Sequence, residues 1–288
     1  MILIALLSIV IATFSPFWGL IFIITFSDKY KNKKNLFYYV YIGFAIALFI
    51  FRVIDVISVI DLIIGVGLTS ALFLWSLQRT LNFINALISV FFLNVIYASM
   101  RVVIFGKQYA EIIAQVMEKY NEFLTQTFQN NSEKIDLTLK FTETFQEFFT
   151  KYYAGIWVFT IVLAAYIGTL LLAKKGNLGW EHRKIRMPYY LIYSMIFALV
   201  GFLWSNSRVA GINAIIMITP LLLIQGLSII DFYWGDFFKR SKFLLFLLIF
   251  SMVVNYFILI LVGLIGLTDI WFNFRKIDME DINESNLN

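Results

Sequence analysis

Residues 209–234 read VAGINAIIMITPLLLIQGLSIIDFYW, an apolar run with Pro220 near its middle. A short basic turn follows at residues 239–242 (KRSK), and a second apolar run then ends in DIWFNFR at residues 269–275. Runs of about 20 apolar residues bounded by aromatic and cationic side chains are typical of helices that cross a bilayer. This stretch therefore predicts a membrane protein that crosses the bilayer more than once.

The composition of the whole chain agrees with a lipid environment. Of the 288 residues, 61% are hydrophobic and 14% are charged, and the mean hydropathy is +0.83. The chain has no cysteine and a single histidine, His182, so we expect no metal site and no cofactor. The net charge of +5 comes from cations in short loops between apolar runs, which indicates membrane topology and not nucleic-acid binding.

Apolar runs of about the length needed to cross a bilayer recur along the chain. They cover residues 2–26, 36–53, 56–78, 83–106, 153–173, 188–206, 209–234 and 243–267. Backbone amides inside lipid must be satisfied within their own segment, which favours helices. The expected fold is therefore an all-α integral membrane protein, a polytopic bundle of about eight transmembrane helices with an outer helical hairpin insertion.

These runs divide the chain into four parts. Residues 1–106 hold the first four spans, and residues 107–152 form an extracytoplasmic amphipathic helical hairpin. Residues 153–277 hold the last four spans and an interfacial helix that begins at Asp269, and residues 278–288 form an acidic tail that we expect to be disordered.

The basic residues of the loops predict the orientation. They follow the first, third, fifth and seventh spans: Lys29, Lys31, Lys33, Lys34, Arg79, Lys174, Lys175, Arg183, Lys184, Arg186, Lys239, Arg240 and Lys242. Such residues collect on the cytoplasmic side of inner-membrane proteins. An even number of spans then places the N-terminus and the C-terminus outside.

The segment between the fourth and fifth runs is amphipathic and not membrane-spanning. Apolar residues recur at helical spacing before and after a break at Asn130 and Asn131, with Glu118, Glu122 and Glu143 among the polar residues between them. Two interpretations remain open. The two helices pack on each other or on the bilayer surface, or they act as a lid or as an arm that docks a partner.

Prolines and small residues add structural expectations. Pro16 and Pro220 lie in mid-span, where they should kink their helices, either to line a binding cavity or for packing alone. A face nearly free of side-chain bulk in the first run should allow another helix to approach closely. That face is formed by Ser8, Ala12, Ser15 and Gly19. Its partner is either a neighbouring span or another subunit, so a membrane-protein partner or a homo-oligomer is one interpretation.

Charged residues inside apolar runs are costly and are therefore candidates for a functional site. Arg52, Asp55, Asp61 and Arg101 all map near the outer ends of the second, third and fourth spans. We expect Asp61 and Arg101 to form a partly buried ion pair or the charged wall of a ligand site.

A second polar set lies toward the cytoplasmic end of the seventh span. Gln225, Asp231 and Asp236 belong to it, and amides such as Gln225 commonly form hydrogen bonds between helices. No phosphate-binding loop, paired-histidine helix or Ser-His arrangement is present in the sequence. We therefore expect no catalytic residue and no enzymatic activity.

A family resemblance is carried by the C-terminal quarter. The pattern consists of QGLSIIDFYW at residues 225–234, the basic turn, an apolar span and GLIGLTDIWFNFR at residues 263–275. It resembles the YybS-like bacterial membrane proteins, a family of unknown function. That family is distantly similar to the substrate-binding components of energy-coupling factor transporters and to MreD, a scaffold of cell elongation.

The resemblance implies a multi-pass protein of the bacterial cytoplasmic (inner) membrane and leaves two functions open. The first is a ligand-binding or transport component that lacks its own ATPase and handles an unknown small molecule. The second is a non-catalytic scaffold for envelope or cell-shape machinery.

Overall fold

The computed structural model describes residues 1–80, 82–127, 132–175 and 182–277, and all regular structure in these ranges is helical. The first half contains α1 (Ile2–Phe14), α2 (Pro16–Thr25), α3 (Lys34–Ile50), α4 (Val56–Ile60), the π-helix η3 (Asp61–Leu68), α5 (Thr69–Thr80) and α6 (Phe83–Thr127). The second half contains α7 (Ser132–Lys174), α8 (Tyr190–Leu203), α9 (Arg208–Arg240), α10 (Lys242–Val254) and α11 (Tyr256–Phe272). Short 3₁₀ turns are η1 (Ser27–Lys29), η2 (Lys31–Lys33), η4 (His182–Lys184) and η5 (Ser205–Ser207). The acidic tail and the break at Asn130 and Asn131 lie outside the described residues.

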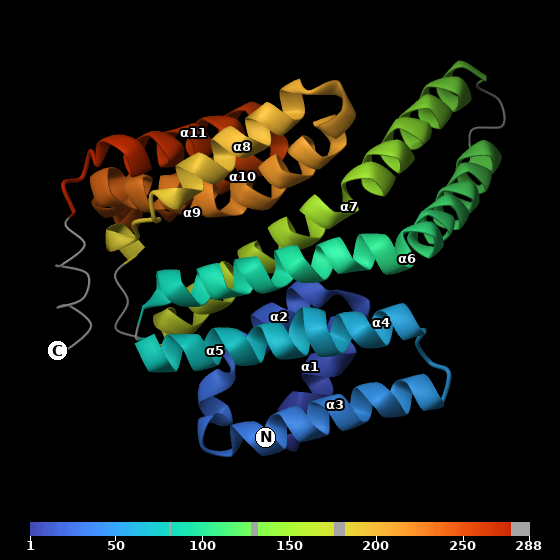
Figure 1. Ribbon diagram of the computed structural model, residues 1–288, viewed down its shortest axis with the longest axis horizontal. Coiled ribbons are helices and arrows are strands. Elements are labelled where there is room, and N and C mark those ends of the chain that lie inside the picture. The colour runs from blue at the N-terminus through green and yellow to red at the C-terminus, as the bar shows by residue number, and fades with distance from the viewer. Residues whose placement is uncertain (81, 128–131, 176–181, 278–288) are drawn as a thin grey trace.

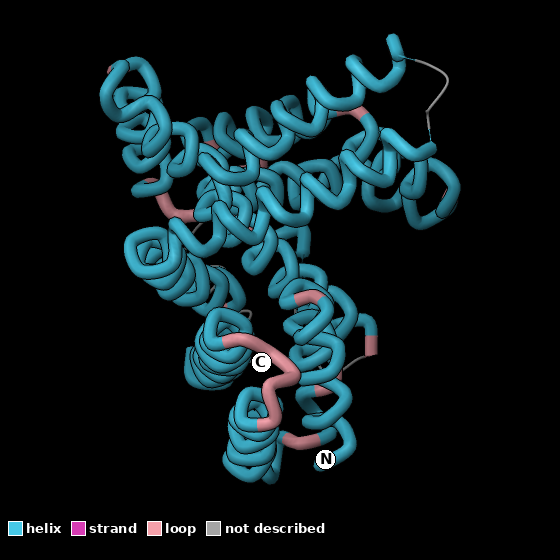
Figure 2. Tube along the Cα trace, turned by 90° about the vertical axis from the view of Figure 1, so that its right-hand side faces the viewer, coloured by secondary structure: helices cyan, strands magenta, loops and turns pink. Residues whose placement is uncertain are grey.

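Two groups of helices are joined by the long pair α6 and α7. Figure 1 shows α1 to α5 on one side of this pair and α8 to α11 on the other. The α6–α7 pair continues beyond both groups as a projecting hairpin, whose tip is turned toward the viewer in Figure 2. The end that faces away from the hairpin is called the basic end, because Lys175 and the loop from His182 to Met187 lie there.

Within the described residues, five helices are long and apolar enough to cross a membrane, or six if α10 and α11 together form one bent span. The five cover Lys31–Ile50, Val56–Thr80, Phe83–Thr127, Ile135–Lys174 and Ser205–Phe238. The expected count of about eight is not confirmed, because α1, α2 and α8 are shorter apolar helices.

The first apolar run is broken, not merely kinked. Ser15 is extended (φ −158°, ψ 112°), and Pro16, which has no N–H to donate, occupies the first turn of α2. The chain turns back so sharply that a Cβ added to Gly19 would lie 2.3 Å from the Cβ of Ala12. The small-residue face therefore serves packing within the chain, where Ser8 is fully buried. Pro220, in contrast, lies inside the continuous helix α9.

The last apolar run leaves the basic end and returns to it. Helices α10 and α11 meet at Asn255 with a bend of 103°. Asp236, shortly before α10, pairs with Arg183 at 2.7 Å, and Arg275, just after α11, donates a 2.8 Å hydrogen bond to the Arg183 carbonyl. Since Arg183 belongs to the loop after α7, residues 273–277 lie at the same end as the basic loops. The expected position of the C-terminus, opposite those loops, therefore does not hold for the last described residues.

The expected interfacial helix is also replaced by a different structure. Asp269 belongs to α11, which ends at Phe272, and Asn273 caps it in the left-handed conformation (φ 48°). Such a cap ends a helix and redirects the chain. Residues 274–277 consequently fold back onto the loop from His182 to Met187 instead of continuing along the membrane surface.

The described parts of the hairpin are helical, but they are not a separate insertion. α6 has 45 residues and α7 has 43, and each runs without interruption from the bundle into the hairpin. At about 1.5 Å per residue, α6 is about 68 Å long, roughly twice the thickness of the hydrocarbon core. Much of the hairpin must therefore lie outside the membrane.

Candidate functional site

Asp61 and Arg101 form a buried ion pair near the hairpin end of the bundle. Asp61 is the first residue of the π-helix η3, and its Oδ2 lies 2.6 Å from Nη2 of Arg101 on α6. The Tyr97 hydroxyl donates a 2.5 Å hydrogen bond to Asp61 Oδ1. The exposed fraction is only 9% for Asp61 and 7% for Arg101. We call Asp61, Tyr97, Arg101, Tyr153 and Trp157 the Asp61 cluster.

Aromatic rings enclose the Arg101 guanidinium. Its carbon atom Cζ lies 4.7 Å from the ring centroid of Trp157 and 4.9 Å from that of Tyr109, distances at which a cation is attracted to a π-face. Trp157 is itself held by a hydrogen bond from its Nε1 to Asn94 Oδ1 (3.1 Å). The charged head is therefore fixed from both α6 and α7.

Two donors of this cluster have no hydrogen-bond partner among the described residues. They are Nε of Arg101 and the hydroxyl of Tyr153, and both atoms are buried. A buried donor without an acceptor costs about 1–3 kcal/mol, and nearly all such groups in native proteins have a partner. Both atoms are donors, so an oxygen acceptor would satisfy either of them.

The π-helix explains how Asp61 is positioned. A Cβ added to Gly65 would lie 2.4 Å from Cζ2 of Trp157, so the absence of a side chain lets the indole pack directly on η3. Asn94 Nδ2 also donates to Thr69 Oγ1 at 3.0 Å, which ties the end of η3 to α6. π-helical segments are frequent at functional sites.

Arg52 and Asp55 are not part of this cluster. Arg52 is exposed and has a positive φ of 55° in the turn after α3. Asp55 caps α4 by accepting a 2.7 Å hydrogen bond from the Ser58 amide. Within the part of the chain that the structure describes, the two residues form no ion pair with each other, because their roles in the turn are local.

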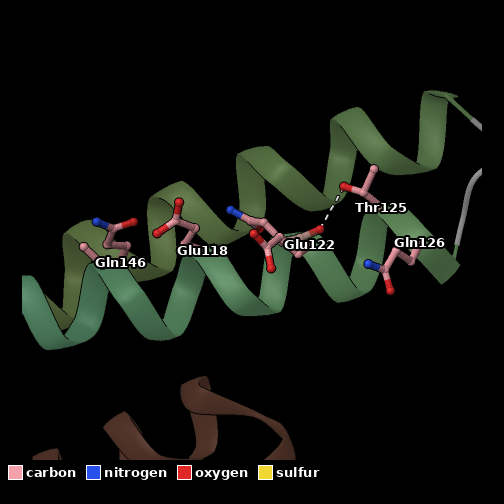
Figure 3. A pocket seen from close by; sticks show the side chains of 7 residues that line it. Glu118, Glu122, Thr125, Gln126 and Gln146 are labelled. Atoms are coloured by element: carbon pink, nitrogen blue, oxygen red, sulfur yellow. Dashed lines mark hydrogen bonds between the residues drawn. The ribbon is translucent and has the colours of Figure 1, made fainter.

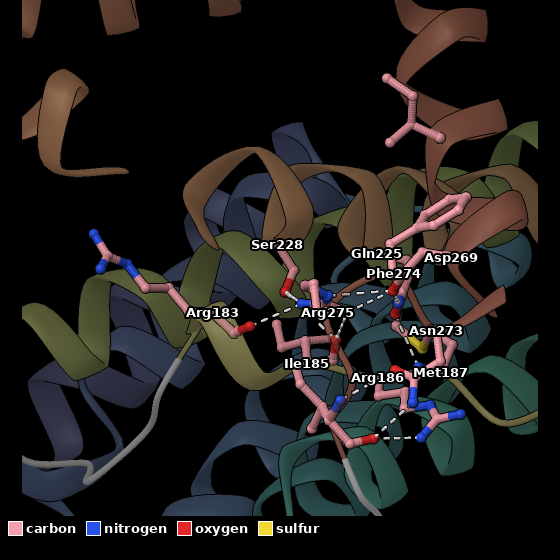
Figure 4. Close-up of polar contacts among 12 residues, drawn as sticks. Arg183, Ile185, Arg186, Met187, Gln225, Ser228, Asp269, Asn273, Phe274 and Arg275 are labelled. Carbon is pink, nitrogen blue, oxygen red and sulfur yellow. Dashed lines mark hydrogen bonds and ion pairs between the residues drawn. The ribbon is translucent and has the colours of Figure 1, made fainter. Parts of the chain in front are cut away.

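A second buried ion pair lies at the basic end (Figure 4). Arg275 Nη2 lies 2.9 Å from Asp269 Oδ2, and each side chain is only 1% exposed. Gln225 donates to the same Asp269 oxygen at 2.7 Å and accepts from the Met187 amide at 2.9 Å. We call Gln225, Ser228, Asp269 and Arg275 the Asp269 cluster.

Every nitrogen of the Arg275 guanidinium has a partner. Nε and Nη2 bond to Asp269, Nη1 bonds to Ser228 Oγ (2.6 Å) and the Arg183 carbonyl, and Nη2 also reaches the Ile185 carbonyl (2.6 Å). Burial lowers the pKa of Arg275, and the Asp269 carboxylate opposes that change. This cluster fastens the chain end to the loop between α7 and α8, which is an architectural role.

Asp231 lies beside this cluster and holds the same loop. Its Oδ2 is 3.1 Å from Nδ1 of His182, whose Nε2 is 2.6 Å from the Tyr166 hydroxyl on α7. Arg183 approaches Asp231 at 3.5 Å, and its hydrogen bond to Asp236 raises the pKa of Arg183. The sequence pattern placed His182 in a loop but did not indicate that it connects α7 to α9.

The two clusters differ in how many of their residues can be predicted from the sequence. Asp61 and Arg101 are visible as isolated charges in apolar runs. Asp269 and Arg275 are visible only as parts of the C-terminal motif, and nothing in the spacing shows that Asn273 reverses the chain and brings them together. Tyr153 and Trp157 carry no signal, because aromatic residues are abundant along the whole chain.

Comparison with known proteins gives one match. No curated protein and no solved structure matches this chain. Residues 1–270 match the model of a family described as "Predicted membrane protein (DUF2232)". With its apolar helices and this match over most of its length, the chain belongs to that family of multi-pass membrane proteins.

Proposed function

We propose that this protein is a ligand-binding or transport component of the bacterial cytoplasmic membrane, without an ATPase or an enzymatic activity of its own. The observation that carries the proposal is the pair of buried, unpartnered donors in the Asp61 cluster, Arg101 Nε and the Tyr153 hydroxyl. A ligand that supplies oxygen acceptors would satisfy these donors.

The charge of the cluster restricts the ligand. Asp61 already balances Arg101, so a second buried anion would leave one uncompensated negative charge, which is costly. An uncharged or zwitterionic molecule with a carbonyl or hydroxyl oxygen avoids that cost. The rings of Tyr109 and Trp157 pack on the Arg101 guanidinium and would hold it in place for such a molecule.

The orientation that suits this function has the basic loops in the cytoplasm and the N-terminus and the hairpin outside. The Asp61 cluster then lies toward the outer surface, where a ligand arrives. The YybS-like pattern and its distant similarity to substrate-binding components of energy-coupling factor transporters support a separate coupling subunit as partner. ATP-driven transport would depend on that partner.

A membrane scaffold related in role to MreD is the second candidate, and the hairpin favours it. The α6–α7 hairpin projects beyond the bundle and carries a polar cleft, as expected of an arm that holds a partner. Reversing the charges of Glu118, Glu122 and Glu143 separates the two functions. Loss of complex formation with intact uptake would favour the scaffold, and loss of uptake with intact assembly would favour transport.

The test begins with gentle purification of the tagged protein from its native membrane, followed by mass spectrometry of the proteins and small molecules that accompany it. We expect a nucleotide-hydrolysing pair with a membrane coupling subunit, and a small molecule that is lost from the double variant Arg101→Gln, Tyr153→Phe. Recovery of envelope-synthesis proteins, with the same small molecules in wild type and variant, would contradict the transport function.

A further inference from the structure

The projecting hairpin carries an apolar stripe on each helix, and neither stripe is covered by the described residues. On α6 the stripe consists of Ile112, Val116, Tyr120 and Phe123. On α7 it consists of Leu137, Phe141, Phe145 and Phe148. The spacing of four, four and three residues is the same on both helices and keeps each stripe on one helix face.

The two stripes lie on the same side of the hairpin. The helices meet along a seam that includes Ile113 on α6 and Thr142 on α7, both of which are buried. At about 100° per residue, each stripe is displaced from its seam by roughly a quarter turn in the same rotational sense. In an antiparallel pair, equal displacements of this kind fall on the same side, so the stripes form one continuous face.

The opposite side of the hairpin is polar. Figure 3 shows a cleft there between α6 and α7. It has a volume of about 870 Å³, and Glu118, Glu122, Gln126 and Gln146 contribute to its lining. The hairpin is therefore amphipathic across its width, with a polar cleft on one face and large apolar side chains on the other.

The apolar face is large enough for a stable interface. Its side chains are 38–65% exposed, and a large apolar side chain offers about 200 Å² when fully exposed. The face therefore presents on the order of 800 Å² of apolar surface, which is about the area that each partner contributes to a standard protein interface. Patches of this size on a soluble surface usually mark an interaction site.

We propose that the apolar face of the hairpin binds the same face of a second copy of this chain, so that two hairpins form a four-helix bundle outside the membrane. Copies in one membrane present their hairpins at the same height and in the same direction. A twofold axis along the membrane normal then places stripe against stripe. Matched stripes from four helices are the arrangement found in the cores of four-helix bundles.

A bilayer surface fits this hairpin less well. Helices that lie on membranes usually carry lysine and arginine on their polar face, where they meet anionic headgroups. The lining of the polar cleft contains carboxylates and amides. Among the described residues from 111 to 147, the exposed lysines Lys119 and Lys140 are outnumbered by exposed carboxylates: Glu111, Glu118, Glu122, Asp136, Glu143 and Glu147. α6 and α7 also continue out of the bundle as unbroken helices, so the hairpin extends past the ends of the neighbouring helices and does not begin as a separate surface helix.

The first test uses cross-linking of the full-length protein in native membrane vesicles. Because the chain has no cysteine, single-cysteine variants report one position each. With a bifunctional maleimide we expect Tyr120→Cys to give a covalent dimer of this chain. Glu118→Cys, one half-turn away on the polar face of the same helix, serves as the matched control and should stay monomeric. Equal cross-linking of the two variants, or none at either position, would overturn the proposal.

The second test measures the mass of the particle in nanodiscs by mass photometry. We expect wild type to be a dimer and the double variant Phe123→Glu, Phe141→Glu to dimerise at least tenfold more weakly, whereas Glu118→Gln should leave the dimer unchanged. A monomeric wild type would overturn the proposal. If the thiol introduced by Tyr120→Cys were also shielded from a water-soluble maleimide in a monomeric particle, lipid would be the occupant instead.

Discussion

Arg101 and Arg275 are both buried, and each is paired with a single aspartate, yet their surroundings are opposite. All three nitrogens of Arg275 are bonded, to Asp269, Ser228 and two backbone carbonyls. Arg101 uses only Nη2 for Asp61, and its Nε is buried without a partner among the described residues. The two guanidinium groups therefore differ in how many of their donors are filled: Arg275 ties several segments together, whereas Arg101 keeps a buried donor that no described residue satisfies.

The largest effect should follow from removing Arg275. The change Arg275→Ala leaves the Asp269 carboxylate buried without its cation and frees the carbonyls of the loop, so we expect a loss of about 3–5 kcal/mol in stability. Tryptophan fluorescence during thermal unfolding in detergent measures it. Lys276→Ala, which removes the exposed neighbouring cation, is the control and should change little. Equal effects of both variants would mean that the Asp269 cluster does not hold the chain end.

The Asp269 cluster can also be disturbed without touching a charge. A Cβ added to Gly266 would lie 2.1 Å from the Leu222 carbonyl oxygen, so Gly266→Ala must push α11 away from α9 and lengthen the hydrogen bond from Gln225 to Asp269. We expect a cost of about 1–3 kcal/mol, as for overpacking in general. The thermal unfolding assay applies here as well.

Gly43→Ala is the matched control, because a Cβ at residue 43 meets nothing within 4 Å. It lies inside α3, where alanine favours the helix by up to about 1 kcal/mol over glycine. The two substitutions should therefore shift the unfolding temperature in opposite directions. A Gly266→Ala protein as stable as wild type would contradict the close approach of α9 and α11.

Gly43 and Gly266 also show which features the sequence alone does not predict. The apolar runs, the helical hairpin and the intramembrane charges are all visible in the sequence, because each depends on composition or local periodicity. Other features depend on which helices pack against each other, and local sequence does not encode this. They are the break at Ser15, the return of α10 and α11 to the basic end, and the need for a glycine at residue 266. Spans were therefore expected wherever an apolar run was long enough, and the expected count of about eight is not confirmed.

The same limit explains the candidate site. A charge in an apolar run must be paired, and this argument led from Asp61 to Arg101. No such rule applies to Tyr153 or Trp157, since aromatic residues occur in contact with lipid, with the protein core and with ligands. The unfilled donors appear only once the chain is folded, because they are defined by the acceptors that are missing around them.

An effect smaller than that of Arg275→Ala is expected for Asp61→Asn. The amide keeps the shape of the carboxylate but leaves the Arg101 charge uncompensated, and the hydrogen bond to a charged group is worth about 1.5–3 kcal/mol. The aromatic rings around Arg101 still attract its charge, which should reduce the loss of stability. The folded yield in detergent should therefore fall less than for Arg275→Ala. Asp55→Asn, a change of the same chemistry in the exposed turn, is the control. Unchanged yield and stability for Asp61→Asn would remove the ion pair as a stabilising element.

The smallest and sharpest effect concerns two tyrosines of the Asp61 cluster. Tyr97 donates to Asp61, so Tyr97→Phe should cost about 1–2 kcal/mol. Tyr153→Phe removes a buried hydroxyl that has no partner among the described residues, so in ligand-free protein it should be neutral or stabilising by about 1 kcal/mol.

The effect of Tyr153→Phe should change sign if a ligand fills the site. Protein isolated gently from its native membrane should lose stability on Tyr153→Phe, because the hydroxyl then has an acceptor. A Tyr153→Phe protein that behaves identically before and after extensive detergent washing would show that no ligand oxygen reaches this group, and Arg101 would then belong with Arg275 as a residue of architecture alone.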